Sequence, residues 1–467
     1  MKKSILTLFV LLLAVATAVP ADHPRNMKFE PLAFDPPEPA RFETSSGLVV
    51  YFLEDHQLPV LTFRAFFHGS SAYDPPGKAG LISLTAGLLR RGGAGDRSPE
   101  QIDQDLDFVG ASIGSNASYD DITADMNCLV KDADFCFGIL SDILMRPKFD
   151  SAKLELDKSN RKDYIRRQND DAAELSRRVY YQTVYTGHPY SIYPTLASTD
   201  NITRDDIIAA HKRFYHPDNC IMAIAGDMTL DEVKGYINKY FASWPKSGRQ
   251  IEPIAPADPQ YTPGVYYAEK DVNQAIIRMG HLSLDDRNPD RFAFDIMNFA
   301  LGGGGFVSRM TGRVRTSAGL AYSVGTYQYT RPLMGTFFGY CYTSAGQMAR
   351  ATQMMIDIIA EVKTDGITAE EMELARESII NSYIFDYDTP SEIVNARAEV
   401  EFLGFPPDHL RRVLEAYQQV TLDDCTFVAK KYLDPDNMVI VITGNKALFD
   451  KPPGLFGPVV DVPMEIK

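Results

Sequence analysis

Histidine is the commonest metal ligand in proteins, and two histidines four residues apart on a helix can hold a zinc ion from one face. The eight histidines of this chain contain no pair at that spacing: His23, His56, His68, His188, His211, His216, His281 and His409. The nearest case is His211 with His216, whose five-residue spacing makes the two side chains diverge around a helix. The histidines are therefore interpreted as lone surface or helix-end residues.

Two serines stand in patterns that nucleophilic enzymes use. The string GASIG at 110–114 fits G-x-S-x-G, but that elbow needs a strand before the serine and a helix after it. Around Ser112 the expected order is the reverse. Ser159 opens an S-x-x-K pattern inside a long predicted helix, and no S-D-N or K-T-G accompanies it. The glycines at 302–305 lack the Lys-Ser/Thr of a phosphate loop and indicate a turn.

The charge of the chain limits the kinds of molecule that it is expected to bind. The formal net charge is -15, which disfavours binding to nucleic acid or to anionic lipid.

The cysteines are odd in number and include no C-x-x-C, so buried free thiols are favoured over a disulfide framework. They are Cys128, Cys136, Cys220, Cys341 and Cys425.

An internal repeat organises the chain. Residues 202–227 run from Thr203 through an amphipathic segment to a Pro-Asp-Asn turn and an apolar run. Residues 420–445 repeat this order, and Thr421 follows Thr203 by 218 residues. Each copy predicts a capped helix, a turn and a buried strand. Two copies this far apart predict two similar domains of about 200 residues and not a short-period solenoid.

The domains are predicted at 27–244 and 264–467, joined by a proline-rich linker at 245–263. Each is expected to be α+β, an antiparallel sheet packed against helices. Periodicity predicts a strand pair at 47–53 and 60–67, paired strands within 109–125, and helices at 80–90, 98–108, 132–146 and 151–178. In the second domain it predicts strands at 265–267 and 274–282, a hairpin of 319–329 with 335–343, and helices at 288–301, 347–364 and 369–385.

An export signal is predicted over residues 1–18. Lys2 and Lys3 precede an apolar run, and residues 16–18 form a small-x-small cleavage site. The run is too short for a stop-transfer helix, although an uncleaved membrane anchor is the alternative. We therefore expect a periplasmic or secreted protein that has no membrane contact after cleavage.

At this point the chain resembles a known family, the M16 metallopeptidases (pitrilysin/insulinase-like, processing-peptidase-like), over nearly its whole mature length. The resemblance is carried by two homologous α+β halves and by the strings at 80–93, 115–118, 188–190, 202–219, 301–309 and 315–323. It implies that each domain has the M16/LuxS-like metallohydrolase fold.

The first helix departs from the family pattern. Active members carry H-x-x-E-H there, with two zinc-binding histidines and a glutamate that activates water. In this chain Ser83, Ala86 and Gly87 stand at those positions, and Tyr164 stands near the place of the third ligand. None of the four can ligate zinc in the expected way. The resemblance therefore implies a chain that binds no metal itself, with the zinc held by a presumed partner.

The resemblance also assigns roles in peptide binding. Active relatives have an arginine and a tyrosine seven residues apart that face the zinc, and Arg315 and Tyr322 keep this spacing. A guanidinium can bind substrate carbonyls, and a phenol can donate to an oxyanion. Asn116 falls on the strand that pairs with an extended substrate in the family. The structural alternatives are an arginine that complements a helix dipole, a tyrosine packed in a strand, and an asparagine at a strand turn.

The implied function is that of a non-catalytic subunit in a periplasmic heterodimeric zinc peptidase. Its partner would be an H-x-x-E-H-containing sister subunit, and its substrates would be extended peptides or unfolded polypeptide. The rival from another class is a peptide-binding or scaffold homodimer with no enzymatic role. A lone peptidase with an unrecognised site is a third alternative, which predicts stoichiometric metal in the pure protein.

Overall fold

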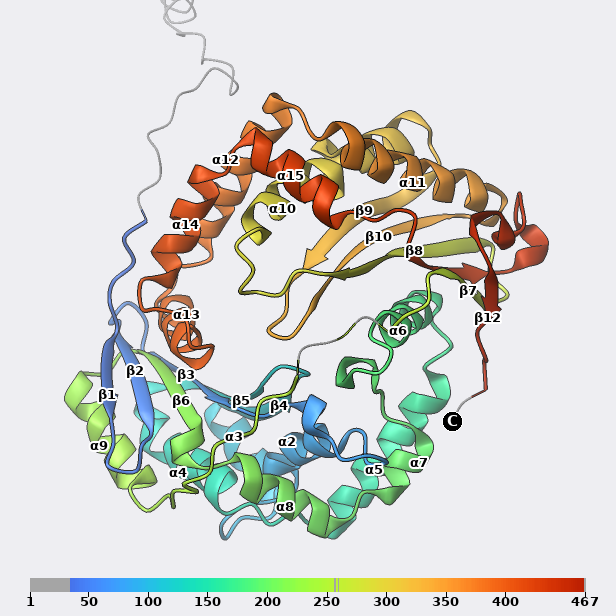
Figure 1. Ribbon diagram of the computed structural model, residues 1–467. Helices are drawn as coiled ribbons and strands as arrows, with labels where there is room; N and C mark the ends of the chain where they lie inside the picture. The colour runs from blue at the N-terminus through green and yellow to red at the C-terminus, as the bar shows by residue number, and fades with distance from the viewer. Residues whose placement is uncertain (1–33, 256–257, 259, 466–467) are drawn as a thin grey trace, which may run out of the picture. The chain divides into compact units, whose positions relative to one another are not determined.

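Two six-stranded sheets organise the computed structural model, which describes residues 34–255, 258 and 260–465 (Figure 1). The predicted signal peptide, residues 1–18, lies outside the described residues. The described part of the predicted linker, 245–263, contains no helix or strand. Within the described residues, no helix is both long and apolar enough to cross a membrane. The domain boundaries themselves stay predictions.

The first sheet has the order β1-β2-β6-β3-β5-β4. Its strands are β1 (Ala40–Glu43), β2 (Val49–Glu54), β3 (Val60–Phe67), β4 (Ser112–Ala117), β5 (Ile122–Leu129) and β6 (Cys220–Gly226). The predicted pairing of the second and third strands is wrong, because β6 lies between them, parallel to β2 and antiparallel to β3. The sheet is therefore mixed and not purely antiparallel.

The second sheet repeats this order as β12-β7-β11-β8-β10-β9. Its strands are β7 (Gly264–Glu269), β8 (Gln274–Ser283), β9 (Ala321–Tyr329), β10 (Gly335–Ser344), β11 (Val439–Gly444) and β12 (Val459–Asp461). The predicted β9–β10 hairpin is confirmed, and the sheet is again mixed because β11 runs parallel to β7. The internal repeat is confirmed too. Thr203 and Thr421 both form capping boxes, and β6 and β11 are buried at every position.

Helices cover one face of each sheet and form the two main cores. The first core combines its sheet with α2 (Leu81–Arg91), α3 (Pro99–Val109), α4 (Ala133–Met145), α8 (Arg204–Phe214) and α9 (Leu230–Phe241). The second uses α10 (Arg291–Asn298), α11 (Met348–Asp365), α12 (Ala369–Phe385), α14 (His409–Gln419) and α15 (Leu422–Tyr432). Helix α10 begins at Arg291, three residues after the predicted start at 288, and continues as a π-helical turn, η6 (Phe299–Gly303). Each half is thus α+β.

The opposite faces of the sheets are covered by helices exchanged between the halves (Figure 1). Helix α13 (Pro390–Phe402) packs Val394, Ala398 and Phe402 on β2, β3 and β6 of the first sheet. Helix α6 (Ala172–Val184) packs on β8 and β11 of the second sheet, and its Tyr180 donates a hydrogen bond to the carbonyl of Phe337 at 3.0 Å. Each half therefore contributes to the core of the other.

The exchange explains one difference from the sequence prediction. A single helix was expected over 151–178, but the structure has α5 (Ser151–Arg167) and then α6, which starts anew at the Asp171 cap. The side chain of Asp171 accepts a hydrogen bond from the backbone N–H of Glu174. The break lets α5 stay on the first half while α6 crosses to the second sheet.

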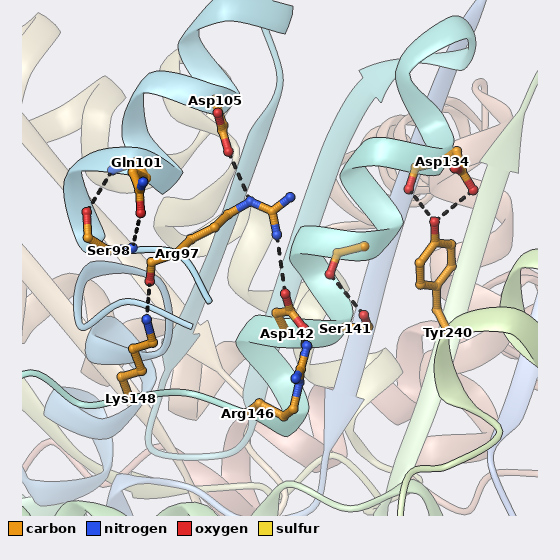
Figure 2. A network of polar contacts seen from close by, with 11 residues as sticks. Arg97, Ser98, Gln101, Asp105, Asp134, Ser141, Asp142, Arg146, Lys148 and Tyr240 are labelled. Atoms are coloured by element: carbon orange, nitrogen blue, oxygen red, sulfur yellow. Dashed lines mark hydrogen bonds and ion pairs between the residues drawn. The ribbon is translucent and has the colours of Figure 1, made fainter. Parts of the chain in front are cut away.

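A polar network holds the helices of the first half together (Figure 2). Arg97 donates to Asp105 at 3.0 Å and to Asp142 at 3.3 Å, and Arg146 donates to the other oxygen of Asp142 at 3.1 Å. The carboxylates are therefore matched by cations between α3 and α4, and the network is structural.

Candidate functional site

Helix α2 carries the residues that stand at the family's zinc positions. Its N-terminus is capped from a distance by Asp74, whose carboxylate accepts from the backbone N–H groups of Gly80 at 2.6 Å and Ile82 at 2.9 Å. Burial raises the pKa of Asp74 from 3.8 to about 6, even though both hydrogen bonds and the nearby Arg161 act to lower it. Along α2, Ser83 is half-buried and Ala86 is fully buried.

A guanidinium occupies the space beside this helix. Arg161 of α5 donates to the carbonyl of Gly80 at 2.6 Å and to the hydroxyl of Ser83 at 2.9 Å. A Cβ on Gly80 would come within 2.1 Å of Arg161 Nη1, so the glycine is needed for this close approach. Burial lowers the pKa of Arg161.

These residues do not fit a zinc ion. The positions of the motif offer no imidazole, thiolate or carboxylate, and the cation on Ser83 would repel another cation. Across the residues that the structure describes, no cluster of three or more His, Cys, Asp and Glu side chains is arranged to hold a metal.

Three of the predicted residues meet around one cavity of about 900 Å³, here called the helix cavity. Ser83 of α2, Asn116 of β4 and Tyr164 of α5 all line it, whereas Ala86 and Gly87 do not. The remaining wall includes Asp74, Tyr119, Asp120, Arg177, Tyr181, Tyr190 and Arg331. The cavity thus combines the N-terminus of α2 with aromatic and charged side chains of both halves.

Asn116 lies on the outermost strand of the first sheet. Strand β4 has β5 as its only sheet neighbour, and Asn116 lies opposite Thr123 with its side chain exposed. An edge strand that borders a cavity offers backbone groups on which an extended chain can pair.

An ion pair closes the helix cavity between the halves. Arg331 donates to Asp120 at 2.9 and 3.1 Å, and its guanidinium lies 3.5 Å from the centre of the Tyr190 ring. Tyr190 donates a hydrogen bond to the same Asp120. Asp120 is therefore already neutralised by Arg331.

Arg315 and Tyr322 have the local geometry that the sequence predicts. Arg315 lies near the end of the π-helical segment η8 (Thr311–Ser317), Gly319 makes the turn with φ of +62°, and Tyr322 lies in β9. The guanidinium lies 5.0 Å from the centre of the Tyr322 ring and 4.7 Å from that of Phe306. Tyr322 is 82% exposed, and the side chain of Arg315 makes no ion pair or hydrogen bond within the described residues.

Two ion pairs and a bulge fix this region. Arg309 makes a bidentate pair with Glu371 at 2.7 and 2.6 Å, and Arg313 pairs with Glu361 at 2.8 Å, so η8 is tied to α11 and α12. The pairing of β9 with β10 shifts at Tyr342 and Thr343, opposite Tyr322. Bulges re-aim side chains next to functional sites, and here both Tyr322 and the adjacent Ser323 face one cavity.

That second cavity, the sheet cavity, has a volume of about 590 Å³. It is lined by Arg177, Tyr181, Gln274, Arg278, Tyr322, Ser323, Tyr327, Phe338, Tyr340 and Tyr342. Arg177 and Tyr181 of α6 line both cavities, so the two cavities border the same helix. Arg315 lines neither cavity and reaches the sheet cavity only through its contact with Tyr322.

Two arginines of this region escaped the sequence prediction. Arg278 is a lone charge inside the apolar strand β8, and a charge in such a strand could have been recognised from the sequence as a candidate functional residue. Arg161 lies in a highly charged stretch of α5, and its sequence gives no comparable signal. Ser112 starts β4 directly after α3, the reverse of a nucleophile elbow, as predicted.

Comparison with known proteins relates this chain to the M16 peptidases. Residues 201–379 match the family model described as "Peptidase M16 inactive domain". The "Non-peptidase homolog YmxG" of Helicobacter pylori is 23% identical over 400 residues, which covers 85% of this chain and 92% of that protein.

Solved structures share the fold. The crystal structure of a peptidase M16 inactive domain from Pseudomonas fluorescens superposes with a TM-score of 0.80 at 24% identity, covering 89% of this chain and 99% of that one. The periplasmic protease PqqL of Escherichia coli superposes with a TM-score of 0.72 at 15% identity, covering 94% of this chain but 50% of that one.

Proposed function

Because this chain is a homologue of the M16 peptidases and matches their inactive-domain model over residues 201–379, we propose that it is the non-catalytic subunit of a heterodimeric zinc peptidase. Its partner carries the H-x-x-E-H helix and the zinc. This chain supplies chamber wall together with Arg315 and Tyr322, which contact an extended peptide and its developing oxyanion.

One contrast carries this proposal. On α2 the side chains that could activate water are replaced, and Arg161 is bonded to Ser83. In the second half, Tyr322 is exposed, Arg315 is partly exposed, and the Arg315 guanidinium has no internal acceptor among the described residues. A guanidinium and a phenol left free in this way are suited to groups from outside the chain.

The comparisons support the division of labour. The Helicobacter pylori relative is called a non-peptidase homolog, and this chain covers half of the length of the protease PqqL. Two chains of this size would together match such a protein in length. The predicted export signal and the periplasmic location of PqqL both favour a periplasmic site of action.

The substrate class follows from the cavity walls. The edge of β4 and the side chain of Asn116 can hold a peptide in extended form through backbone pairing, which has little side-chain selectivity. Unfolded segments and peptides fit this description, whereas folded proteins present few free strands.

The test is reconstitution with a sister subunit that bears H-x-x-E-H, encoded beside this chain. We expect hydrolysis of an unstructured peptide only when both chains are present. Arg315→Ala and Tyr322→Phe should lower the rate, while Arg350→Ala, an exposed arginine on α11, should not. Full activity of the partner alone contradicts the proposal. A stable self-dimer that binds peptide and never associates with the partner would favour the scaffold alternative.

A further inference from the structure

Arg278 is a buried cation without a counter-charge. It lies in the middle of β8, opposite Tyr340 on β10 and Val441 on β11, and is 8% exposed. Its Nε has no hydrogen-bond partner, and its guanidinium lies 4.6 Å from the centre of the Phe338 ring. Among the described residues, no carboxylate forms an ion pair with it.

Such an arrangement is costly for the free protein. A buried charge that lacks a partner loses its hydration without compensation, and arginine cannot shed its proton to escape the cost. Burial accordingly lowers the pKa of Arg278. Buried charges are normally paired, so the site is complete only when an anion is present.

The first sheet contains an arginine at a comparable position that does have an ion-pair partner. Arg64 of β3 lies opposite Ala223 on β6, and Arg278 lies opposite Val441 on β11, the repeat equivalent of Ala223. Opposite Arg64 on the other side is Asp125, which accepts its hydrogen bond at 2.6 Å. The corresponding neighbour of Arg278 is Tyr340, so the second sheet keeps the cation and lacks the acid.

The sheet cavity around Arg278 suits a carboxylate. No aspartate or glutamate lines it, although the chain as a whole is strongly acidic. Arg177 also lines the cavity but is already paired with Glu174, to which its Nε donates at 3.1 Å, so Arg278 is the cation without an ion pair among the described residues; the hydroxyls of the lining tyrosines add donors. A volume of about 590 Å³ lies within the usual range of ligand pockets.

We propose that the sheet cavity binds a carboxylate of a peptide, with the Arg278 guanidinium as its ion-pair partner. The peptide origin follows from position, because Arg177 and Tyr181 join this cavity to the helix cavity and the β4 edge. The carboxylate belongs either to the C-terminus or to an acidic side chain. The proposal deepens the proposed function, since Tyr322 lines the same cavity, but binding needs no partner subunit.

Calorimetric titration of the isolated full chain tests it. Three N-acetylated peptides of Ala, Leu and Ser would be compared: a free C-terminal acid, its amide, and the amide with one internal Glu. The free acid should bind about tenfold or more tightly than the plain amide, as expected for one charge-assisted interaction. Tight binding of the Glu peptide would assign the site to acidic side chains, and weak binding of it would assign the site to the C-terminus.

Variants distinguish a loss of carboxylate binding from a loss of folding. Arg278→Met should abolish the preference for the acid. Tyr340→Asp places a carboxylate opposite Arg278, as Asp125 lies opposite Arg64, and should abolish the preference too. Arg64→Gln on the first sheet is the matched control and should keep it. Melting curves establish that each variant is folded.

Equal affinity for all three peptides, or no binding of any, overturns the carboxylate site. A preference that survives Arg278→Met overturns it as well. Neither outcome touches the proposed function, which is measured as joint activity with the partner. Conversely, loss of joint activity in Arg315→Ala together with an intact acid preference would show that the two roles are separate.

Discussion

The two sheets of this protein share a strand order but differ in how their charges are matched. On the first sheet Arg64 has Asp125 as its partner, and next to that sheet Arg161 is held by Ser83 and the carbonyl of Gly80. On the second, the guanidinium groups of Arg278 and Arg315 lie over aromatic rings and have no ion pair within the described residues. The two halves thus differ in these arginines, which are bonded inside the chain in the first half and lack a counter-charge in the second.

The two halves therefore differ in what surrounds their arginines. In the first half, the Arg161 guanidinium lies beside α2, where Ser83, Ala86 and Gly87 offer no metal ligand. In the second half, packing around the Arg315–Tyr322 pair is preserved by the ion pairs of Arg309 and Arg313. The second half thus combines arginines that are paired internally with two that have no ion pair among the described residues.

The largest expected effect concerns the second half, which carries Arg315. Under the proposed function, Arg315→Ala should lower the turnover of the reconstituted pair by about 10²-fold or more, because a charged donor to the substrate at the reacting centre is lost. The free energy of unfolding should change by less than about 0.5 kcal/mol, since the side chain is partly exposed and makes no ion pair within the described residues. Peptidase rates and denaturant titrations measure the two quantities. A large loss of stability would contradict the view that this pair serves a partner.

The second expected effect is a pH-dependent change in stability in the first half, which carries Asp74. Since burial raises the pKa of Asp74 to about 6, the folded chain holds this proton more tightly than the unfolded chain. The stabilisation is fully present below about pH 4 and is lost as the pH rises through about 6. The free energy of unfolding of the wild type, relative to Asp74→Asn, should fall by about 3 kcal/mol over this window.

Denaturant titrations at several pH values would measure that difference. Tyr322→Phe serves as the control, because Tyr322 is exposed and does not line the cavity that contains Asp74. A wild-type profile parallel to that of Asp74→Asn would show that the carboxyl is not buried as described.

A smaller effect compares the two sheets directly. Arg278→Met should raise the free energy of unfolding by about 1–2 kcal/mol, because an unpaired buried charge is replaced by an apolar chain of similar length. Thermal melting in the absence of peptide measures it. A destabilised variant would indicate that the guanidinium is satisfied in the free chain.

The smallest effect is on the first sheet. Arg64→Gln should lower the free energy of unfolding by less than about 1 kcal/mol, because the Arg64 and Asp125 side chains are 43% and 37% exposed. Added salt should shrink the difference further. Opposite signs for the two arginine variants would confirm the contrast between the sheets, and equal signs would remove it.

Local signals explain what could be predicted from the sequence. The capping boxes at Thr203 and Thr421, the buried strands that follow, and the helix-turn-strand around Gly319 depend on near neighbours in the chain. Strand β4, which carries Asn116, could also be predicted, because apolar and polar residues alternate along it and a turn follows it.

Long-range pairing set the limits. No local pattern shows that β6 inserts between β2 and β3, because the strand order depends on pairing between residues far apart in the chain. Continuous periodicity over 151–178 hid the Asp171 cap and therefore the crossing of α6. The contact of Arg161 with Ser83 depends on how α5 packs against α2, and the missing counter-charge of Arg278 depends on which residue faces it across two strands.

The exchange of α6 and α13 also bears on how the chain emerges during synthesis. The outer face of the first sheet, with Tyr51, Phe66 and Ile221, is sealed only by α13, which is made some 170 residues after β6, counting from Cys220 to Pro390. Until then an apolar surface stays open to water and to other nascent chains. A polypeptide that stops short of Pro390 would therefore expose this surface permanently and would aggregate rather than survive as a folded first half.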